Sequence, residues 1–405
     1  MKMTGILGIV VLLGIAVLMS NNRKAISLRV VFWGLGLQLI FAILILKTPV
    51  GEPVFGFVDK AFMRLVSFSD AGSDFLFKSF VPGVGYHEAM VNFAFRALPT
   101  IIFFSSLMTL LYYFGIIQFV VKWIAKIMIK TMGTSGSETL SVSANIFVGQ
   151  TEAPLMVRPF IDRMTKSELM AVMTGGFATV AGGVLAIYVI WLKDIPGIAG
   201  HLLAASVMSA PAAMVVAKII HPETKESETL GDLKIHVEKV DTNAMEALGR
   251  GATDGLKLAA NVAAMLIAFV SIISLMNFLL GLAGTSMEEI FGFIFKPLAW
   301  TMGIPWNEAG TLGTLMGEKF IFTELIAYGN LRELITAGAL SDRTAIIASY
   351  ALCGFANFGS IGIQLGGIGG MAPNRKKDLA KLALKAMIGG ALASWITASL
   401  AGILI

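Results

Sequence analysis

Long uncharged apolar runs constrain this chain more than any other feature. A helix needs about 20 predominantly apolar residues to cross a bilayer, and eight stretches of roughly that length occur along the 405 residues. They are Met3–Met19, Val30–Leu46, Pro99–Val121, Leu169–Leu192, Leu202–Ala217, Leu258–Met287, Ala345–Ala372 and Ala386–Ile405. Hydrophobic residues make up 56% of the chain and charged residues 14%, which excludes an ordinary soluble domain. The sequence therefore predicts an all-α polytopic membrane protein with eight transmembrane helices.

Two further hydrophobic stretches, Ser137–Phe160 and Ile290–Tyr328, are interrupted by glycine, proline and charged residues. We interpret both as re-entrant hairpins, because irregular backbone at membrane depth is tolerated only where protein, water or a ligand satisfies it. With the N-terminus outside, this reading places the basic loop residues, Arg158 and Arg375 among them, inside and both termini outside, as the positive-inside rule requires. The amphipathic segment Val54–Phe80 is expected to lie in the membrane interface.

The second half of the chain repeats the order of features in the first. "TE" at Thr151–Glu152 is followed by "GFATVAG", and "TE" at Thr323–Glu324 by "GFANFGS", with separations of 24 and 30 residues from the glutamate to the first glycine. Each unit contains a hairpin, a glycine-interrupted span and a final span, and the loop charges give the two hairpins opposite orientations. Inverted repeats with broken helices are typical of secondary transporters.

The repeat divides the chain into five parts. They are 1–135 (N-terminal spans and interfacial helix), 136–217 (first inverted repeat), 218–257 (cytoplasmic polar or interfacial segment), 258–285 (scaffold span) and 286–405 (second inverted repeat).

Glu152 and Glu324 lie in hydrophobic surroundings where an ionised carboxylate is costly. The cost near the bilayer centre is about 2.5–3.5 kcal/mol, so we expect both glutamates to line a polar cavity. Gln150 adds a donor and an acceptor, and Thr151 adds a hydroxyl. This mixture favours a neutral solute with several hydrogen-bonding groups over an anion. The alternative is that both glutamates pair with nearby lysine or arginine and only hold the hairpins in place.

The motifs resemble those of the bacterial concentrative nucleoside transporters over nearly the whole chain. "GQTEAPL" at Gly149–Leu155 is similar to the family's first-hairpin tip, and "GEKFIFTELIAY" at Gly317–Tyr328 to its second-hairpin motif. "GFANFGS", which begins at Gly354, resembles the second broken helix of the family. Thr323 stands where the family usually has asparagine and Leu325 where it has phenylalanine, which leaves the base preference and the coupling ion open.

The resemblance implies a role for each residue of the binding site. It implies that the nucleobase is bound by Gln150, Thr151 and Glu152, with an apolar contact from Val184. It implies that the ribose is bound by Glu324, Asn357 and Ser360, and that Phe355 lines the pocket. It also implies a homotrimer in which each protomer has its own site and moves a transport domain relative to a scaffold.

Sodium is the coupling ion that we expect. Asn145 and Thr179 supply side-chain oxygens, and the glycines that flank Thr179 favour unwinding that frees main-chain carbonyls such as those of Val148 and Val180. Neutral and carbonyl oxygens suit a hard monovalent cation. The family resemblance points to the same four positions. The alternative is proton coupling through Glu152 or Glu324.

Other classes of function have less support in the sequence. The four histidines fall in loops or near span ends, and none accompanies Cys353, so no nucleophile with an adjacent base is evident. No metal-spaced His/Cys set and no phosphate loop occurs, so we expect neither an enzyme, nor a cofactor other than the coupling ion, nor ATP coupling. The net charge of +5 is explained by cytoplasmic loops rather than by nucleic-acid binding. The expected location is the bacterial cytoplasmic membrane, and a channel is the alternative from another class.

Overall fold

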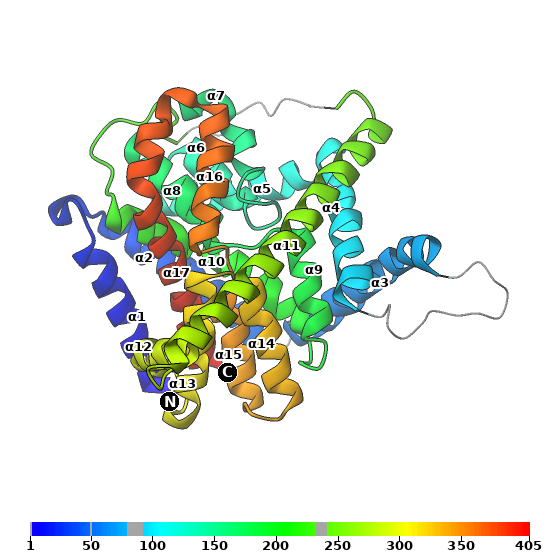
Figure 1. Cartoon of the computed structure of the whole chain (residues 1–405). Coiled ribbons are helices and arrows are strands. Elements are labelled where there is room, and N and C mark those ends of the chain that lie inside the picture. Colours follow the sequence, from blue (N-terminus) through cyan, green and yellow to red (C-terminus); the bar gives the residue numbers. More distant parts are fainter. Residues whose placement is uncertain (1, 49–50, 79–91, 232–240) are drawn as a thin grey trace.

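The computed structural model describes residues 2–48, 51–78, 92–231 and 241–405, and these ranges consist of helices and their connections (Figure 1). Parts of the predicted segments 54–80 and 218–257 lie outside the described residues. The α-helices are α1 (Lys2–Leu18), α2 (Leu28–Leu46), α3 (Gly51–Phe77), α4 (Leu98–Tyr113), α5 (Ile116–Met132), α6 (Gly136–Ala144), α7 (Arg158–Ile161), α8 (Lys166–Ala178), α9 (Gly182–Trp191), α10 (Ile198–Ile220), α11 (Ala244–Gly281), α12 (Met287–Thr301), α13 (Trp306–Ile321), α14 (Glu324–Thr336), α15 (Asp342–Leu352), α16 (Phe358–Met371) and α17 (Lys376–Leu404).

Six helical segments in the described part of the chain are long and apolar enough to cross a membrane. They are Leu28–Leu46, Phe93–Tyr113, Lys166–Trp191, Ile198–Ile220, Ala244–Gly281 and Pro373–Leu404. The predicted first span corresponds to α1, which is apolar but shorter, and the predicted span Ala345–Ala372 is divided into α15 and α16. The chain is thus an all-helical polytopic membrane protein with several apolar spans.

Three predicted boundaries are wrong. The span Pro99–Val121 is not continuous, because α4 ends at Tyr113 and Gly115 turns the chain with a left-handed φ of 79°. The span Leu258–Met287 belongs to α11, which begins earlier, at Ala244, and ends at Gly281. Apolar composition continues across these boundaries, whereas a glycine conformation or a helix cap sets them.

The third correction concerns the second hairpin. The hydrophobic stretch Ile290–Tyr328 contains more than one hairpin arm, since α12 occupies its first part and Gly303, with a φ of 92°, separates α12 from α13. The hairpin itself consists of α13 and α14, and its tip lies at Thr323. Helix α12 packs closely against α13. A Cβ atom on Gly317 of α13 would lie only 2.4 Å from the Phe291 ring of α12.

The two hairpins approach the centre of the molecule from opposite ends. The first, formed by α6 and the short α7, lies at one end, and α13 and α14 lie at the other, together with both chain termini (Figure 1). Arg375 belongs to the end of the first hairpin, because its guanidinium donates to the carbonyls of Ile161, Asp162 and Met164. Arg375 and Arg158 of α7, which are predicted to share one side of the membrane, thus lie at the same end of the fold.

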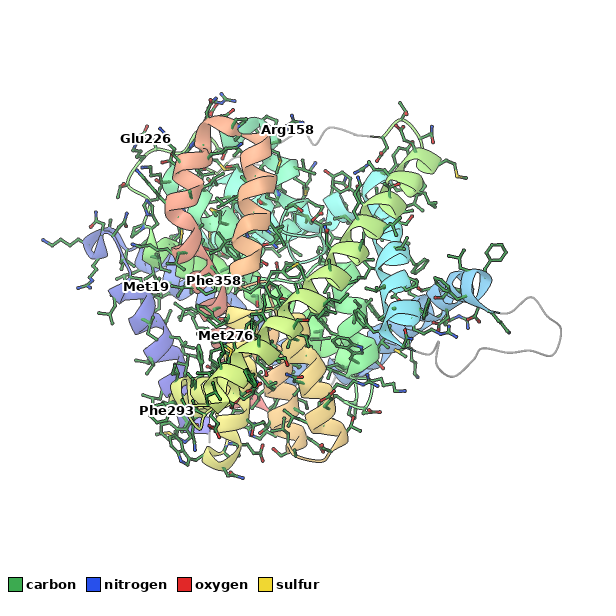
Figure 2. The ribbon with its side chains drawn as sticks, in the orientation of Figure 1. Met19, Arg158, Glu226, Met276, Phe293 and Phe358 are labelled. Atoms are coloured by element: carbon green, nitrogen blue, oxygen red, sulfur yellow. The ribbon has the colours of Figure 1, made fainter. Side chains whose placement is uncertain are left out.

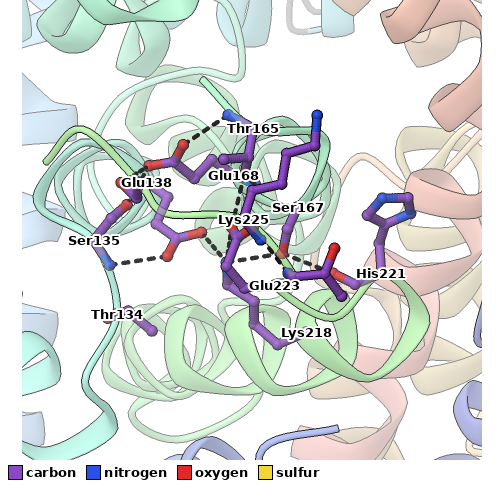
Figure 3. A network of polar contacts seen from close by, with 12 residues as sticks. Thr134, Ser135, Glu138, Thr165, Ser167, Glu168, Lys218, His221, Glu223 and Lys225 are labelled. Carbon is purple, nitrogen blue, oxygen red and sulfur yellow. Dashed lines mark hydrogen bonds and ion pairs between the residues drawn. The ribbon is translucent and has the colours of Figure 1, made fainter. Parts of the chain in front are cut away.

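A buried polar network anchors the base of the first hairpin (Figure 3). Lys218, at the end of α10, forms an ion pair of 2.6 Å with Glu138 of α6, and both side chains are almost fully buried. Glu168, at the start of α8, accepts hydrogen bonds of 2.6 Å from Ser135 and from Ser227. Because breaking a buried, hydrogen-bonded ion pair is strongly destabilising, this network fixes α6 relative to α8 and α10.

Candidate functional site

A buried carboxylate that accepts hydrogen bonds from neighbouring side chains marks the tip of the second hairpin. Glu324 is the first residue of α14 and is only 4% exposed. Its Oε1 accepts a hydrogen bond from the Tyr188 hydroxyl and its Oε2 accepts one from the Asn357 amide, both at 2.9 Å. The helix N-terminus at this position also favours a negative charge. Helices α9, α14 and α16 therefore converge on one carboxylate.

The residues that flank Glu324 hold the tip of the hairpin in place. Thr323 is the N-cap of α14, and its hydroxyl accepts a hydrogen bond from the Leu325 amide at 3.1 Å. Threonine therefore retains the capping role that asparagine also performs. Among the described residues, neither Glu324 nor Glu152 forms an ion pair, so nothing there supports the alternative of purely structural, salt-bridged glutamates.

Three predicted site residues lie at the break between α15 and α16. Asn357 caps α16 through its Oδ1, which accepts from the Ser360 amide at 2.8 Å, while its Nδ2 donates to Glu324. The capping bond therefore fixes the orientation of the amide that reaches the carboxylate. Ser360 is buried next to this cap, and Phe355 is partly exposed within the break.

The first hairpin contacts the same helix α16 farther along its length. Gln150 is 6% exposed, and its Oε1 accepts a hydrogen bond of 3.1 Å from Gln364. Thr151 packs against Gly367, where a Cβ would lie 2.5 Å from the threonine methyl group. Glu152 is exposed, and its Oε1 accepts from the Thr151 hydroxyl at 3.1 Å. Helix α16 thus carries predicted ribose residues at its start, and one and two turns later it contacts the predicted base residues of the first hairpin.

The two helix breaks touch each other. Gly354 has a φ of 111°, and a Cβ there would lie 2.7 Å from the Phe177 carbonyl oxygen and 2.8 Å from the Ala178 carbonyl carbon. Only glycine permits both this conformation and this approach. Val184 is buried in the first turn of α9, one helical turn before Tyr188 and on the same helix face. The break between α15 and α16 thus lies against the break between α8 and α9, the helix that carries Val184.

The two segments that carry the predicted cation ligands are joined by a hydrogen bond. The Phe147 carbonyl accepts from the Gly182 amide at 3.3 Å, which joins the first hairpin to the break between α8 and α9. Asn145 is fully buried, its Nδ2 donates to the Ser141 carbonyl, and its Oδ1 has no hydrogen-bond partner. Thr179 donates to the Gly175 carbonyl at 3.0 Å and keeps free lone pairs. A buried acceptor without a donor fits a cation that prefers neutral oxygens.

The second break carries its own cation. Lys319 of α13 is fully buried, and its ammonium donates to the carbonyls of Ala351 and Cys353 at 3.0 and 2.9 Å. Ser394 of α17 donates to the same Cys353 carbonyl at 2.6 Å. The carbonyls freed where α15 ends are therefore paired within the protein.

Sequence reasoning assigned no role to Tyr188, Gln364 and Lys319. Two of the three had a visible signal, because Gln364 is the lone amide in a glycine-rich apolar helix and Lys319 is the one basic residue of α13. An intramembrane polar residue of this kind is by default expected to have a specific partner. Tyr188 had no such signal, since an aromatic residue in an apolar span is ordinarily part of the core.

The chain matches known proteins over its whole length. Residues 201–402 match the family described as "Na+ dependent nucleoside transporter C-terminus", residues 7–80 the corresponding N-terminus, and residues 94–194 the family described as "Nucleoside recognition". The chain is 43% identical to an uncharacterized transporter of Haemophilus influenzae, an alignment that covers 100% of this chain and 98% of that protein. The chain belongs to the concentrative nucleoside transporter family.

This concentrative nucleoside transporter is also similar to proteins with more specific descriptions. It is 40% identical to sodium/nucleoside cotransporter 1 of Rattus norvegicus, over 98% of this chain and 63% of the rat protein. The structure of CNTnw in an inward-facing substrate-bound state matches with a TM-score of 0.92 and 42% identity, covering 99% of this chain and 98% of CNTnw. A CNTnw variant in an outward-facing state matches with a TM-score of 0.91 and 41% identity, over 100% and 97% of the two chains. The family is one of transporters, so the prediction that the protein is not an enzyme is confirmed.

Proposed function

We propose that this transporter takes up nucleosides together with sodium across the bacterial cytoplasmic membrane. The observation that carries the proposal is the buried carboxylate of Glu324, which accepts from Tyr188 and Asn357 at the junction of the two helix breaks. A carboxylate in this position is able to accept hydrogen bonds from two vicinal hydroxyls, which matches the diol of a ribose. Ser360, in the first turn of α16, would add a hydroxyl contact.

The nucleobase is assigned to the first hairpin. Gln150 and Thr151 reach α16, and Glu152 is exposed beside them. Together they offer donors and acceptors on one side, while Val184 and Phe355 supply apolar surface for the flat faces of a base. The proposed pocket thus has two half-sites: the first hairpin, with Gln150, Thr151 and Glu152, forms the first, and Glu324 with Asn357 and Ser360 forms the second. Acceptors and donors in both half-sites suit a ligand with a polar base at one end and a diol at the other. Nucleobases or sugars alone would use only one of the two half-sites.

Sodium is assigned to the first helix break. Asn145 Oδ1 and Thr179 Oγ1 would hold the ion together with the main-chain carbonyls of Val148 and Val180. The orphaned, buried Oδ1 of Asn145 supports this assignment. Moving one charge through about 100 mV supplies roughly 2.3 kcal/mol, and a tenfold sodium gradient adds about 1.4 kcal/mol. The two together sustain accumulation of several hundredfold, on the order required to scavenge dilute nucleosides.

The membrane arrangement that we propose has eight crossings, two opposed re-entrant hairpins and both termini outside. The hairpins at opposite ends of the fold and the two termini at one end are consistent with it (Figure 1). We propose an elevator-type movement of the repeats relative to α4 and α11, within a homotrimer. Matches to CNTnw in inward- and outward-facing states support alternating access. In the most apolar part of α11, no residue is buried within the protomer. This exposed apolar surface is available for contact with a neighbouring protomer.

Two alternatives make different predictions. Coupling to protons through Glu152 or Glu324 would make uptake follow a pH gradient instead of a sodium gradient. A channel, in which the hairpins line a pore, would equilibrate nucleosides but never concentrate them.

Uptake of radiolabelled uridine and adenosine against a gradient in proteoliposomes tests the proposal. Glu324→Gln keeps the shape of the side chain and removes its charge, so ribonucleoside transport should fall by about 1.5–3 kcal/mol in apparent transition-state stabilisation, or roughly tenfold to a hundredfold. Glu226→Gln, on an exposed loop, is the matched control and should transport normally. Unchanged uptake in Glu324→Gln at equal expression would exclude the ribose role, and flux that stops at equal concentrations would favour a channel.

A further inference from the structure

A cavity of about 750 Å³ lies beside the second hairpin, among α12, α13 and α14. Glu324 and the residues of the proposed nucleoside site do not line it. Its volume is within the range of about 300–1,000 Å³ that small-molecule sites occupy. We call it the α12–α14 cavity, and its charged lining consists of Glu288, Glu289, Lys296, Glu318 and Glu333.

The charges of the cavity are unbalanced. Four carboxylates face one ammonium, and Lys296 stacks on the Trp306 ring, with its nitrogen 4.6 Å from the ring centroid. Within the described ranges, none of the four carboxylates forms an ion pair with a lysine, arginine or histidine. Such a site attracts a positively charged ligand.

Glu318 adds the observation that distinguishes this cavity from an ordinary acidic surface. Glu318 is only 5% exposed, and its Oε1 accepts a hydrogen bond of 2.9 Å from Asn330. Its other oxygen, Oε2, is buried without any hydrogen-bond partner. A buried carboxylate oxygen left unpaired is costly, and a donor that enters from the cavity would remove this cost.

The chemistry of the lining selects an organic ammonium over a metal ion. Calcium and magnesium require several oxygens at about 2.0–2.6 Å, and no group of three acidic, histidine or cysteine residues in the described chain is arranged to hold a metal. Leu315 and Leu334 give the same cavity apolar walls. An amine with a carbon stem satisfies both features, because its ammonium donates to Glu318 while its methylenes cover the leucines.

We propose that the α12–α14 cavity is an accessory binding site for a small organic amine. An ammonium group donates to Glu318 Oε2, and a second ammonium on a short aliphatic stem reaches the carboxylates at the rim, Glu288, Glu289 and Glu333. Because the occupant contacts α12 and both arms of the hairpin that carries Glu324, it holds these helices together. The site acts from outside the nucleoside pocket, and its existence does not depend on which nucleoside or ion is transported.

Thermal unfolding of the purified full-length protein, with diaminobutane as the probe, tests the proposal. A ligand that binds the folded state raises Tm in a saturable way, whereas butanediol, which has the same length without charge, should leave Tm unchanged. Glu318→Gln should weaken the apparent affinity by about tenfold or more. Glu226→Gln, which removes one negative charge at the opposite end of the molecule from Phe293 at the cavity, should behave as wild type (Figure 2).

Several results would overturn the proposal. They are no saturable shift in wild type, the same affinity in Glu318→Gln, or an equal shift with potassium or magnesium chloride at matched ionic strength. If Glu318→Gln does not fold, Glu333→Gln provides the test, because its side chain is exposed and its loss does not disturb the core. Unchanged diaminobutane affinity in Glu333→Gln would then contradict the assignment of the rim.

Discussion

The two helix breaks of this transporter differ in what satisfies their backbone. At the second break, the ammonium of Lys319 donates to the carbonyls of Ala351 and Cys353. At the first break, Thr179 donates to the Gly175 carbonyl, and the buried Oδ1 of Asn145 is left without a partner. Freed carbonyls in apolar surroundings require a donor or a cation. The comparison teaches that the second break is closed by a covalently attached lysine donor, whereas beside the first break a buried oxygen remains unpaired, and we assign sodium to that oxygen.

The largest expected effect comes from removing the Lys319 side-chain donor. Lys319→Met retains an unbranched side chain but leaves the Ala351 carbonyl without this donor, while the Cys353 carbonyl keeps its bond from Ser394. We expect the free energy of unfolding to fall by about 1–3 kcal/mol, because a buried carbonyl left without a donor is costly. Thermal unfolding in detergent measures the change, with Lys122→Met on the exposed face of α5 as the control. A Tm equal to that of the control would mean that the second break does not depend on its lysine.

A smaller effect, on ribonucleoside uptake, is expected from removing a hydrogen bond to Glu324 while keeping its carboxylate. Tyr188→Phe removes one of the three side-chain donors to Glu324 and keeps the ring that stacks on Tyr328 at 4.0 Å. We expect the ratio of maximal uptake rate to KM for ribonucleosides to fall by about tenfold, as for a hydrogen bond to a charged group. Tyr113→Phe, outside the site, controls for loss of a phenol. Equal uptake by the two variants would show that the remaining donors, Asn357 and Thr323, suffice to orient Glu324.

The smallest effect on uptake is expected from Gln150, at the tip of the first hairpin. Gln150→Leu removes the acceptor that Gln364 contacts, and a neutral hydrogen bond is worth about 0.5–1.5 kcal/mol. Because we assign Gln150 to the base, competition among the common ribonucleosides should change in rank as well as in strength. A uniform drop for every nucleoside would instead indicate that the tip has only a structural role.

The sequence predicted the breaks better than it predicted the helix ends. Glycines in "GFATVAG" and "GFANFGS" indicated unwinding, and the chain does break after Ala178 and after Leu352. The turn at Gly115 was missed, because the apolar run continues through it and only the glycine conformation, with a φ of 79°, ends the helix. Hydropathy reports the environment of a segment, whereas a helix boundary depends on a single residue.

The site was predicted as a set of residues but not as a set of contacts. Glu324 and Asn357 were recognised from motifs, and they are hydrogen-bonded to each other. Tyr188 donates to Glu324 across 136 residues, and Gln364 to Gln150 across 214. No local pattern encodes such distant pairs, because they depend on how helices from the two halves of the chain pack. The motifs therefore indicate which side chains carry the chemistry, and the fold decides which of them meet.

Sodium dependence of uptake tests the central contrast between the two breaks most directly. Uridine accumulation is measured in proteoliposomes with sodium or with choline at fixed pH, for the wild type and for Asn145→Leu, which removes the unpaired Oδ1. Our account predicts that wild-type accumulation is lost in choline and that Asn145→Leu accumulates little uridine even in sodium. Accumulation that persists in choline and follows an imposed pH gradient would contradict it, and would assign the coupling to Glu152 or Glu324.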